Sequence, residues 1–162
     1  MINARAETAA GKPAFKEPLE RRRCLVPADG FFCEWKRNGN SKRPFCFELH
    51  ERQPFAFAGL WDRWQTPDGS YLQTCTILTT TPNQLLADIH DRMPVILAPE
   101  DCDLWLDPGF RDIAAAAELL RPFDDKLMRC YPVSERVNNV ANDNPECSEP
   151  VSLPPPVQSG LF

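Results

Sequence analysis

The stretch Cys24-Leu-Val-Pro-Ala-Asp-Gly-Phe-Phe-Cys-Glu-Trp35 gives the clearest indication of fold, because it places apolar segments on either side of a turn. Pro27-Ala-Asp-Gly30 is a turn signal, since proline, aspartate and glycine favour the backbone angles of tight turns. Apolar segments joined by such a turn are typical of β-strands. We therefore expect a sheet to form around this stretch.

The rest of the chain alternates between strand-like and helical segments. Further strands are predicted at 44–49, 55–61, 71–81, 95–97 and 128–133. Short helices are predicted at 14–23, 82–90, 98–106 and 113–120. Mostly antiparallel strands with helices packed outside them describe an α+β fold, with a twisted or barrel-like sheet and peripheral helices.

Length and composition are those of a globular protein. The chain has 162 residues, of which 43% are hydrophobic and 25% charged, values that suit one domain. We expect this domain at 1–144 and a proline-rich tail without a core at 145–162. No apolar run is long enough to span a membrane and no signal peptide is visible, so we expect a cytoplasmic protein.

The cysteines do not suggest a metal site. None of the seven is spaced C-x-x-C and the chain has two histidines, so we expect reduced core cysteines and no metal or cofactor. The absence of Gly-x-Ser-x-Gly argues against a serine hydrolase. A Cys–His nucleophile pair stays open, with Cys33 or Cys102 as the thiol, although no local signature supports it.

Charge is distributed unevenly. The net charge is −5, but residues 1–52 hold 11 Lys/Arg and 7 Asp/Glu, a net of +4, and the remaining residues carry a net of −9. The basic excess includes the run Arg21–Arg23 and is compatible with a local groove for phosphates. The alternative is a solvated helix end rich in arginine.

Two residues have the chemistry for proton transfer. Glu34 lies among aromatic residues, where lost hydration favours the protonated acid; the alternative is a glutamate on the wet face of a strand. Histidine moves protons near neutral pH, so His90 is a second candidate. Its alternative is a histidine that the dipole favours at a helix C-terminus.

Other candidates would bind rather than react. Arg92 could grip a phosphate with both guanidinium nitrogens, or form a salt bridge with Asp88 or Asp91. Trp64 could stack on an unpaired base, although packing in the core is the better expectation for a tryptophan here.

Three strings in this order resemble the SOS response-associated peptidase (SRAP) family, which links itself covalently to abasic sites in single-stranded DNA. They are Asn3-Ala-Arg-Ala-Glu-Thr8, the stretch 24–35, and His90-Asp-Arg-Met-Pro-Val-Ile-Leu97. The resemblance extends from Ile2 to about Val151 and includes Tyr131-Pro-Val-Ser134. It implies a barrel-like fold, autoprocessing peptidase activity and a role in the DNA damage response.

The resemblance also implies roles for individual residues. In the family a processed N-terminal cysteine forms a Schiff base with the opened sugar and then closes a thiazolidine. Asn3, Glu34 and His90 match residues that assist this cysteine, with His90 donating a proton to the sugar. Arg5 and Arg92 are similar to arginines that contact the DNA.

This chain departs from the family pattern at two positions. The family nucleophile directly follows the initiator Met, whereas Ile2 stands there in this sequence. We therefore expect either a misassigned start or a truncated remnant, which would bind single-stranded DNA without covalent chemistry or be an inactive fragment. The family usually has Gly-aromatic-aromatic-Glu-Trp, so Cys33 is an apparent insertion. One extra residue turns later side chains to the other face of a strand, so Glu34 points inward only if a bulge absorbs it.

The last residues predict a protein partner. Gln158-Ser-Gly-Leu-Phe162 looks like the short peptide with which bacterial repair proteins dock on the DNA sliding clamp. Gln158 would make the polar contact, and Leu161 and Phe162 would be the apolar anchors in a pocket. The alternative is an ordinary frayed terminus.

Overall fold

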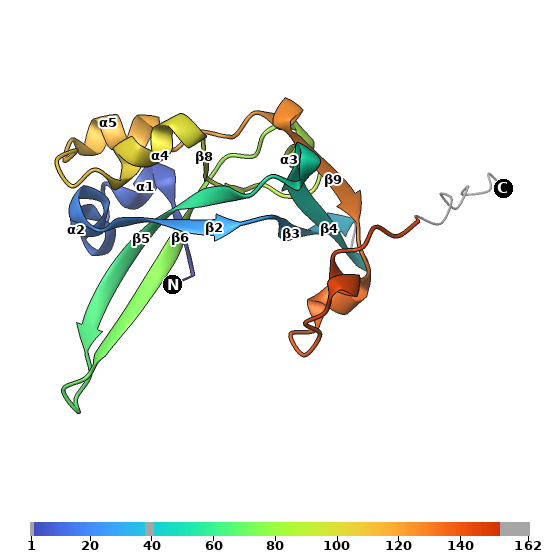
Figure 1. Cartoon of the computed structure of the whole chain (residues 1–162), viewed down its shortest axis with the longest axis horizontal. Helices are drawn as coiled ribbons and strands as arrows, with labels where there is room; N and C mark the ends of the chain where they lie inside the picture. The colour runs from blue at the N-terminus through green and yellow to red at the C-terminus, as the bar shows by residue number, and fades with distance from the viewer. Residues whose placement is uncertain (1, 38–40, 153–162) are drawn as a thin grey trace.

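The computed structural model describes residues 2–37 and 41–152, and these form two β-sheets with short helices around them (Figure 1). The first sheet has the central strand order β1 (Asn3–Arg5), β6 (Tyr71–Thr80), β5 (Phe55–Gln65), β2 (Arg23–Ala28). Short strands β7 (Met93–Pro94) and β8 (Ile96–Leu97) pair with β6 and β5. The second sheet contains β3 (Phe31–Arg37), β4 (Ser41–Leu49) and β9 (Met128–Pro132).

Four of the helices gather at one end of the first sheet (Figure 1). They are α1 (Ala6–Ala9), α2 (Pro13–Arg21), α4 (Pro99–Leu106) and α5 (Ile113–Glu118). Helix α3 (Gln84–Ala87) lies apart from them, and 3-10 turns occupy His50–Arg52, Asp125–Leu127, Glu135–Asn138 and Pro145–Cys147. The predicted α+β class, with a curled sheet and few helices, is confirmed.

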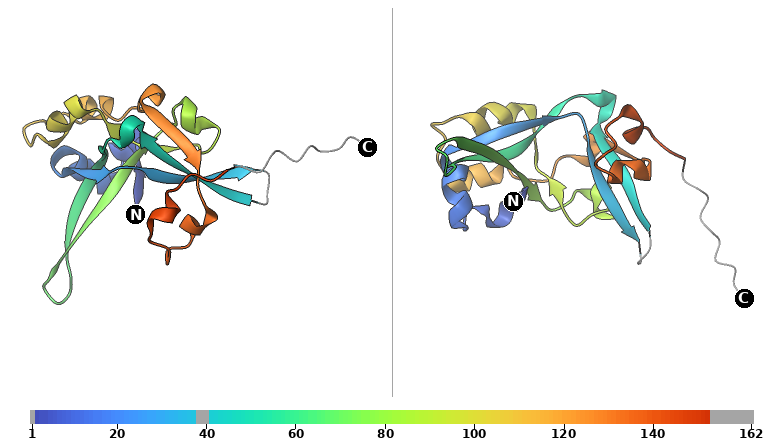
Figure 2. Two further views of the ribbon diagram at one scale, coloured as in Figure 1. Left: turned by 45° about the vertical axis from the view of Figure 1, so that its right-hand side comes forward. Right: turned by 90° about the horizontal axis from the view of Figure 1, so that it is seen from below.

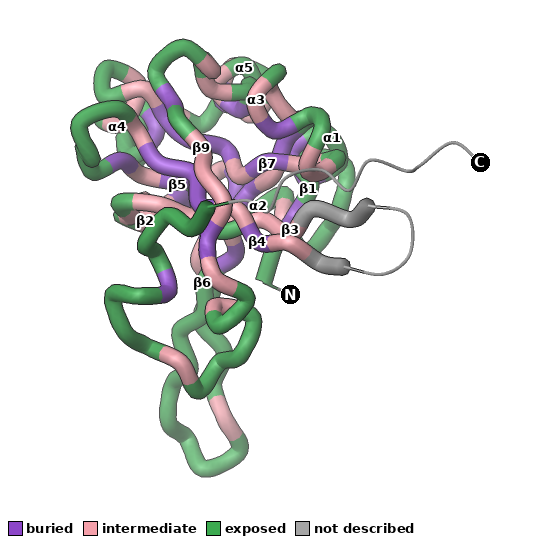
Figure 3. Tube along the Cα trace, turned by 90° about the vertical axis from the view of Figure 1, so that its right-hand side faces the viewer, coloured by how far each residue is buried: buried purple, intermediate pink, exposed green. Residues whose placement is uncertain are grey.

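Two apolar clusters hold these layers together. One lies between the first sheet and the four helices, around the fully buried Trp105, Leu19 and Leu78. The other is aromatic and lies where the two sheets meet, with Phe31 stacked on Phe47 at a ring separation of 5.2 Å. Figure 3 shows the buried residues gathered in this central region. Apolar burial at both interfaces is the main stabilising contribution to such a fold.

Arg23 has a structural role that its place in a basic run did not reveal. Its side chain is 9% exposed and lies over the ring of Trp105 at 5.4 Å. Its guanidinium donates hydrogen bonds of 2.6–3.0 Å to the carbonyl oxygens of Leu19, Glu20, Trp105, Asp107 and Phe110. Arg23 therefore ties α2 to α4, and it does not contribute to a phosphate groove.

The other two arginines of the run form ion pairs. Arg22 binds Glu17 at 3.2 Å and Asp62 at 3.4 Å, and Arg21 binds Glu20 at 3.5 Å. The helix-end alternative is thus correct for Arg21, which ends α2, and for Arg22, which caps it, whereas the buried Arg23 begins β2.

Strands β5 and β6 continue beyond the sheet as a two-stranded arm (Figures 1 and 2). Trp64 pairs with Leu72 in this arm and is 58% exposed, so the expectation that it packs in the core is wrong. Tyr71 is also largely exposed and lies under the guanidinium of Arg63 at 4.5 Å. The arm therefore exposes Trp64, Tyr71 and Leu72 among polar residues, outside the two clusters.

The structure differs from the predicted elements at both ends of the chain. Strand β1 and helix α1 were not predicted. The segment expected to be a tail from 145 instead packs on the domain as far as it is described, since Cys147 is 8% exposed and Pro150 bridges Val133. The predicted clamp-binding residues Gln158, Leu161 and Phe162 lie outside the described residues. Within the described residues, no helix is long and apolar enough to cross a membrane.

Candidate functional site

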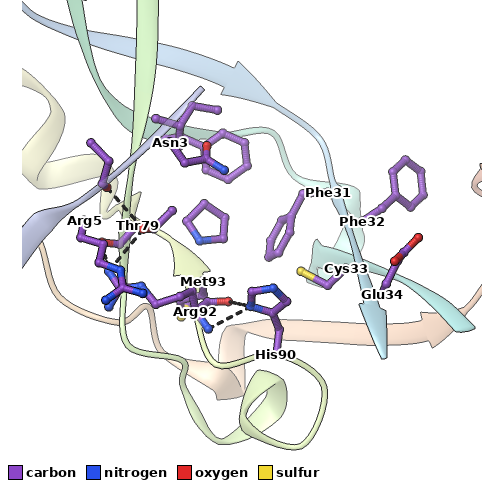
Figure 4. Close-up of a pocket in the computed structure, with 14 residues that line it drawn as sticks. Asn3, Arg5, Phe31, Phe32, Cys33, Glu34, Thr79, His90, Arg92 and Met93 are labelled. Atoms are coloured by element: carbon purple, nitrogen blue, oxygen red, sulfur yellow. Dashed lines mark hydrogen bonds between the residues drawn. The ribbon is translucent and has the colours of Figure 1, made fainter. Parts of the chain in front are cut away.

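A cavity of about 590 Å³ lies where the two sheets meet, and it contains five of the six predicted site residues. Its walls come from β1, from the start of β3, from β5 and β6, and from the turn before β7 (Figure 4). The lining residues are Asn3, Ala4, Arg5, Phe31, Phe32, Cys33, Glu34, Phe57, Ile77, Thr79, His90, Arg92, Met93 and Pro94. The exception is Trp64, which lies on the arm.

Strand β1 presents Asn3 and Arg5 to the cavity. It pairs in parallel with β6, with Asn3 opposite Ile77 and Arg5 opposite Thr79. Because side chains alternate along a strand, Ala4 is buried in the core while its two polar neighbours are exposed. The three residues of β1 thus place the Asn3 amide and the Arg5 guanidinium at one rim of the cavity.

His90 follows α3, in a turn that holds its ring through Nδ1. The backbone N–H of Arg92 donates to Nδ1 at 3.0 Å. Nδ1 also lies 3.0 Å from the backbone carbonyl oxygen of Arg92, so it accepts from the N–H in one neutral tautomer and donates to the carbonyl in the other. A carboxylate oxygen of Asp91 lies 3.2 Å from Nδ1 and would accept a proton from the doubly protonated ring. Both protonation states therefore have a partner, which suits a residue that transfers protons.

Arg92 is bound by Glu7, a residue that sequence reasoning did not select. Two guanidinium nitrogens donate to the two carboxylate oxygens at 2.8 Å each. One of them also contacts the Thr79 backbone carbonyl and, at 3.2 Å, the Thr79 hydroxyl. The Glu7 hydrogen bond with Arg92 lowers the pKa of that carboxyl. The salt-bridge alternative is thus correct in kind but wrong in partner, because Glu7 and not Asp88 or Asp91 binds Arg92.

Strand β3 contains no bulge, so Glu34 does not turn toward His90. Its pairing with β4 is continuous, with Phe31 opposite Phe47, Cys33 opposite Phe45 and Glu34 opposite Pro44. Figure 4 shows Phe31 and Cys33 on the side facing His90, and the carboxylate of Glu34 on the other side. The condition for an inward Glu34 is not met, and Glu34 lies at the edge of the cavity instead.

Comparison with known proteins identifies the same family as the sequence resemblance carried by these residues. Residues 1–140 match the family described as SOS response associated peptidase (SRAP). The chain belongs to the SRAP family. It is similar to abasic site processing protein YoqW of Bacillus subtilis, with 50% identity over 150 residues. That match covers 92% of this chain and 66% of YoqW.

More distant SRAP relatives and solved structures agree. Abasic site processing protein HMCES of Gallus gallus is 35% identical over 172 residues, covering 93% of this chain and 50% of HMCES. A crystal structure of a Bacteroides thetaiotaomicron protein superposes with a TM-score of 0.84 at 36% identity, covering 93% of this chain and 66% of that one. The chain thus spans between half and two thirds of the length of these proteins.

The thiol of Cys33 is the titratable group that the SRAP site holds on the inner face of β3. Burial raises the pKa of this thiol to about 11, so it is protonated at neutral pH. No group of three His, Cys, Asp or Glu side chains among the described residues is placed to hold a metal ion. The site of this SRAP chain therefore offers an imidazole, a neutral thiol, an amide and an exposed arginine.

Glu7 could have been selected from sequence only through its motif. It lies two residues after Arg5 in the Asn-Ala-Arg-Ala-Glu string of the SRAP resemblance, and nothing in the local pattern points to Arg92 as its partner. Thr79, at the end of a β-branched strand, is likewise indistinguishable from its neighbours until β1 and the His90 turn pack against it.

Proposed function

We propose that this chain recognises and processes abasic sites in single-stranded DNA. The observation that carries this proposal is the convergence of Asn3, Arg5 and His90 on one cavity, although His90 is far from the other two in sequence. A cavity of this size falls in the range of small-molecule sites. A deoxyribose without its base is small enough to enter, whereas the connected phosphates would remain at the rim.

Each of these residues has a different role, which follows from its position in the cavity. Arg5 is exposed at the rim and binds a phosphate of the strand. Asn3 has both a donor and an acceptor for the sugar hydroxyls. His90 donates a proton to the sugar ring oxygen as the ring opens to the aldehyde. The relatives that bear the words abasic site processing in their names support the choice of substrate.

Arg92 acts on this reaction chiefly by holding other groups in place. Its backbone N–H orients the His90 ring and its guanidinium is already bound to Glu7. A DNA phosphate could use Arg92 only in competition with that carboxylate. The DNA contact that the resemblance implies for Arg92 is therefore weaker than the contact of Arg5.

Covalent attachment is the second part of the proposal. The resemblance assigns it to a cysteine ahead of Asn3, which would attack the aldehyde through its amine and close a thiazolidine with its thiol. An inward carboxylate from β3 does not assist this step, because Glu34 points outward. Proton transfer to and from the sugar then falls to His90.

The test compares three single-stranded oligonucleotides of equal length. One contains an abasic site, one an intact nucleotide and one a tetrahydrofuran analogue that cannot open to an aldehyde. Selective binding of the abasic strand supports the function, and a shifted band on a denaturing gel supports the covalent step. Selective binding without that band would leave non-covalent recognition, and equal binding of all three strands would overturn the proposal.

The clamp-binding peptide is a separate proposal. It rests on the sequence of the last five residues, Gln158–Phe162. A pull-down with purified bacterial sliding clamp should succeed with the full chain and fail when these five residues are removed. Equal recovery of both forms would exclude this peptide as the docking element.

A further inference from the structure

The unbroken register of β3 puts a thiol where a carboxylate was expected. In the Gly-aromatic-aromatic-Glu pattern, the glutamate is the third residue after the glycine, which corresponds to position 33 when counted from Gly30. Cys33 occupies that position, pairs opposite Phe45 and shares the inner face with Phe31. The extra residue is therefore accommodated by replacing the inward group, and not by bending the strand.

Cys33 lies in reach of whatever fills the cavity. It packs at the edge of the aromatic cluster, and its sulfur points from β3 toward the side of the cavity that holds His90 (Figure 4). Among the described residues, it is the only cysteine that lines this cavity. Cys46 points to the other side of the sheet, near Tyr131 and Glu48, and Cys75 is exposed on β6.

We propose that Cys33 is a catalytic residue of the site, one that adds reversibly to the aldehyde of the opened abasic sugar. The inference rests on the proposed function. In the addition, the sulfur forms a bond to C1′, the carbonyl π bond breaks, and the thiol proton passes through water to the carbonyl oxygen. The product is a hemithioacetal, and no oxidant or reductant is required.

The surroundings of Cys33 fit a reversible adduct. Burial raises the pKa of the thiol to about 11, so the addition starts from the neutral thiol and the S–H proton must leave as the C–S bond forms. His90 lines the same cavity, and its imidazole can hydrogen-bond the developing hydroxyl. Because Cys33 offers no amine, the adduct cannot proceed to a thiazolidine and must reverse when the sugar closes.

The adduct would hold the aldehyde form of the sugar inside the cavity. Its role is to retain the reactive carbonyl and to protect it from other amines until the strand leaves or a second nucleophile arrives. This role differs from that of the glutamate, which could only position a base or donate a proton.

The experiment uses the full chain and compares the abasic strand with the tetrahydrofuran strand. Wild-type protein should prefer the abasic strand by roughly tenfold, a modest gain for a positioned addition. Cys33→Ala should bind both strands with the affinity that wild type has for the tetrahydrofuran strand. Cys75→Ala, which removes an exposed cysteine outside the cavity, should keep the full preference.

A labelling experiment on the unaltered protein covers the case in which Cys33→Ala does not fold. The abasic strand should slow alkylation of Cys33 more than the tetrahydrofuran strand does, while the labelling of Cys75 stays constant, as read by peptide mass spectrometry. Equal protection by the two strands, or a preference that survives in Cys33→Ala, would overturn the role of Cys33 and leave the proposed function standing. Equal binding of the abasic strand, the tetrahydrofuran strand and the intact strand by wild type would instead overturn the function.

Discussion

The carboxylate of Glu7 and the guanidinium of Arg92 form two parallel hydrogen bonds of 2.8 Å across 85 positions of sequence. The pair connects the start of α1 to the turn that carries His90. Arg92 has a side chain that is 17% exposed, whereas that of Glu7 is 44% exposed. The Glu7 side of the pair is thus partly exposed to water. Removal of the Glu7 carboxylate would leave the largely buried guanidinium of Arg92 without its ion-pair partner.

Replacing Glu7 should destabilise the fold and disturb His90. Glu7→Gln keeps the shape of the side chain but removes the charge, and we expect a loss of about 1 kcal/mol in the free energy of unfolding. Urea denaturation at neutral pH measures this loss. The matched control is Glu146→Gln, whose bond to Arg136 at 2.7 Å joins two exposed side chains, so its loss should be close to zero. Equal effects in both variants would contradict the prediction.

The same pair should make stability depend on acid. Arg92 lowers the pKa of Glu7 below its ordinary value of 4.5 in the folded protein. The stabilisation is therefore complete above pH 4.5 and is lost as the pH falls through the lowered folded value. We expect the difference between wild type and Glu7→Gln to vanish in acid, as shown by urea titrations at a series of pH values. A difference that persists at the lowest pH would show that charge is not its origin.

Arg5 should set the salt dependence of DNA binding. Arg5→Ala is expected to weaken binding to every single-stranded sequence alike and to reduce the slope of log affinity against log salt by about 0.7. Fluorescence anisotropy at several salt concentrations gives both quantities. Arg111 lies outside the cavity and donates a hydrogen bond to the Pro108 carbonyl. Arg111→Ala should therefore leave the slope unchanged. An unaltered slope in Arg5→Ala would remove Arg5 from the phosphate contacts.

His90 should control the chemical step more than binding. His90→Gln keeps a hydrogen-bonding side chain but cannot transfer a proton, and we expect the reaction with an abasic strand to slow by roughly 10²–10⁴-fold. Single-turnover rates at saturating protein separate this effect from affinity. His50→Gln changes the other histidine of the chain, which lies outside the cavity, and should react at the wild-type rate. A wild-type rate in His90→Gln would assign the proton to another group.

Arg23 should be required for stability and not for DNA binding. Arg23→Lys loses the planar fork that reaches five carbonyl oxygens, and we expect a loss of roughly 2–4 kcal/mol in the free energy of unfolding. Arg21→Lys alters an exposed arginine in the same run and should cost almost nothing. Denaturant titration of both variants tests the distinction. A large effect of Arg21→Lys would show that the run acts as a unit.

Much of the fold was predictable because local patterns agree with tertiary structure in the long strands. The β-branched segment at Tyr71–Thr80 and the apolar segment from Phe55 form strands, as expected. The helix predicted over 82–90 shortens to Gln84–Ala87. Asn83 caps its start, and the chain then turns so that the Arg92 N–H can reach His90.

The remaining features depend on contacts that no local pattern encodes. Strand β1 exists because three residues find a partner in β6, more than 70 positions later. Charge runs cannot distinguish a buried arginine from an exposed one, so Arg23 was grouped with Arg21. The direction of Glu34 depended on a bulge, and only the pairing of β3 with β4 could decide it. The sequence thus predicted which residues line the cavity better than it predicted where their side chains point.

The parallel pairing of β1 with β6 also has a consequence for the order of folding. Asn3 and Arg5 leave the ribosome before their partners, since β1 has nothing to pair with until Ile77–Thr79 have been synthesised, and His90 follows later still. Contacts this distant in sequence form slowly, because the intervening loop must close before they become favourable. The helices and the β5–β6 hairpin can form earlier from local contacts. The cavity therefore assembles only after β6 and the His90 turn have been synthesised, so a shorter nascent chain lacks this site.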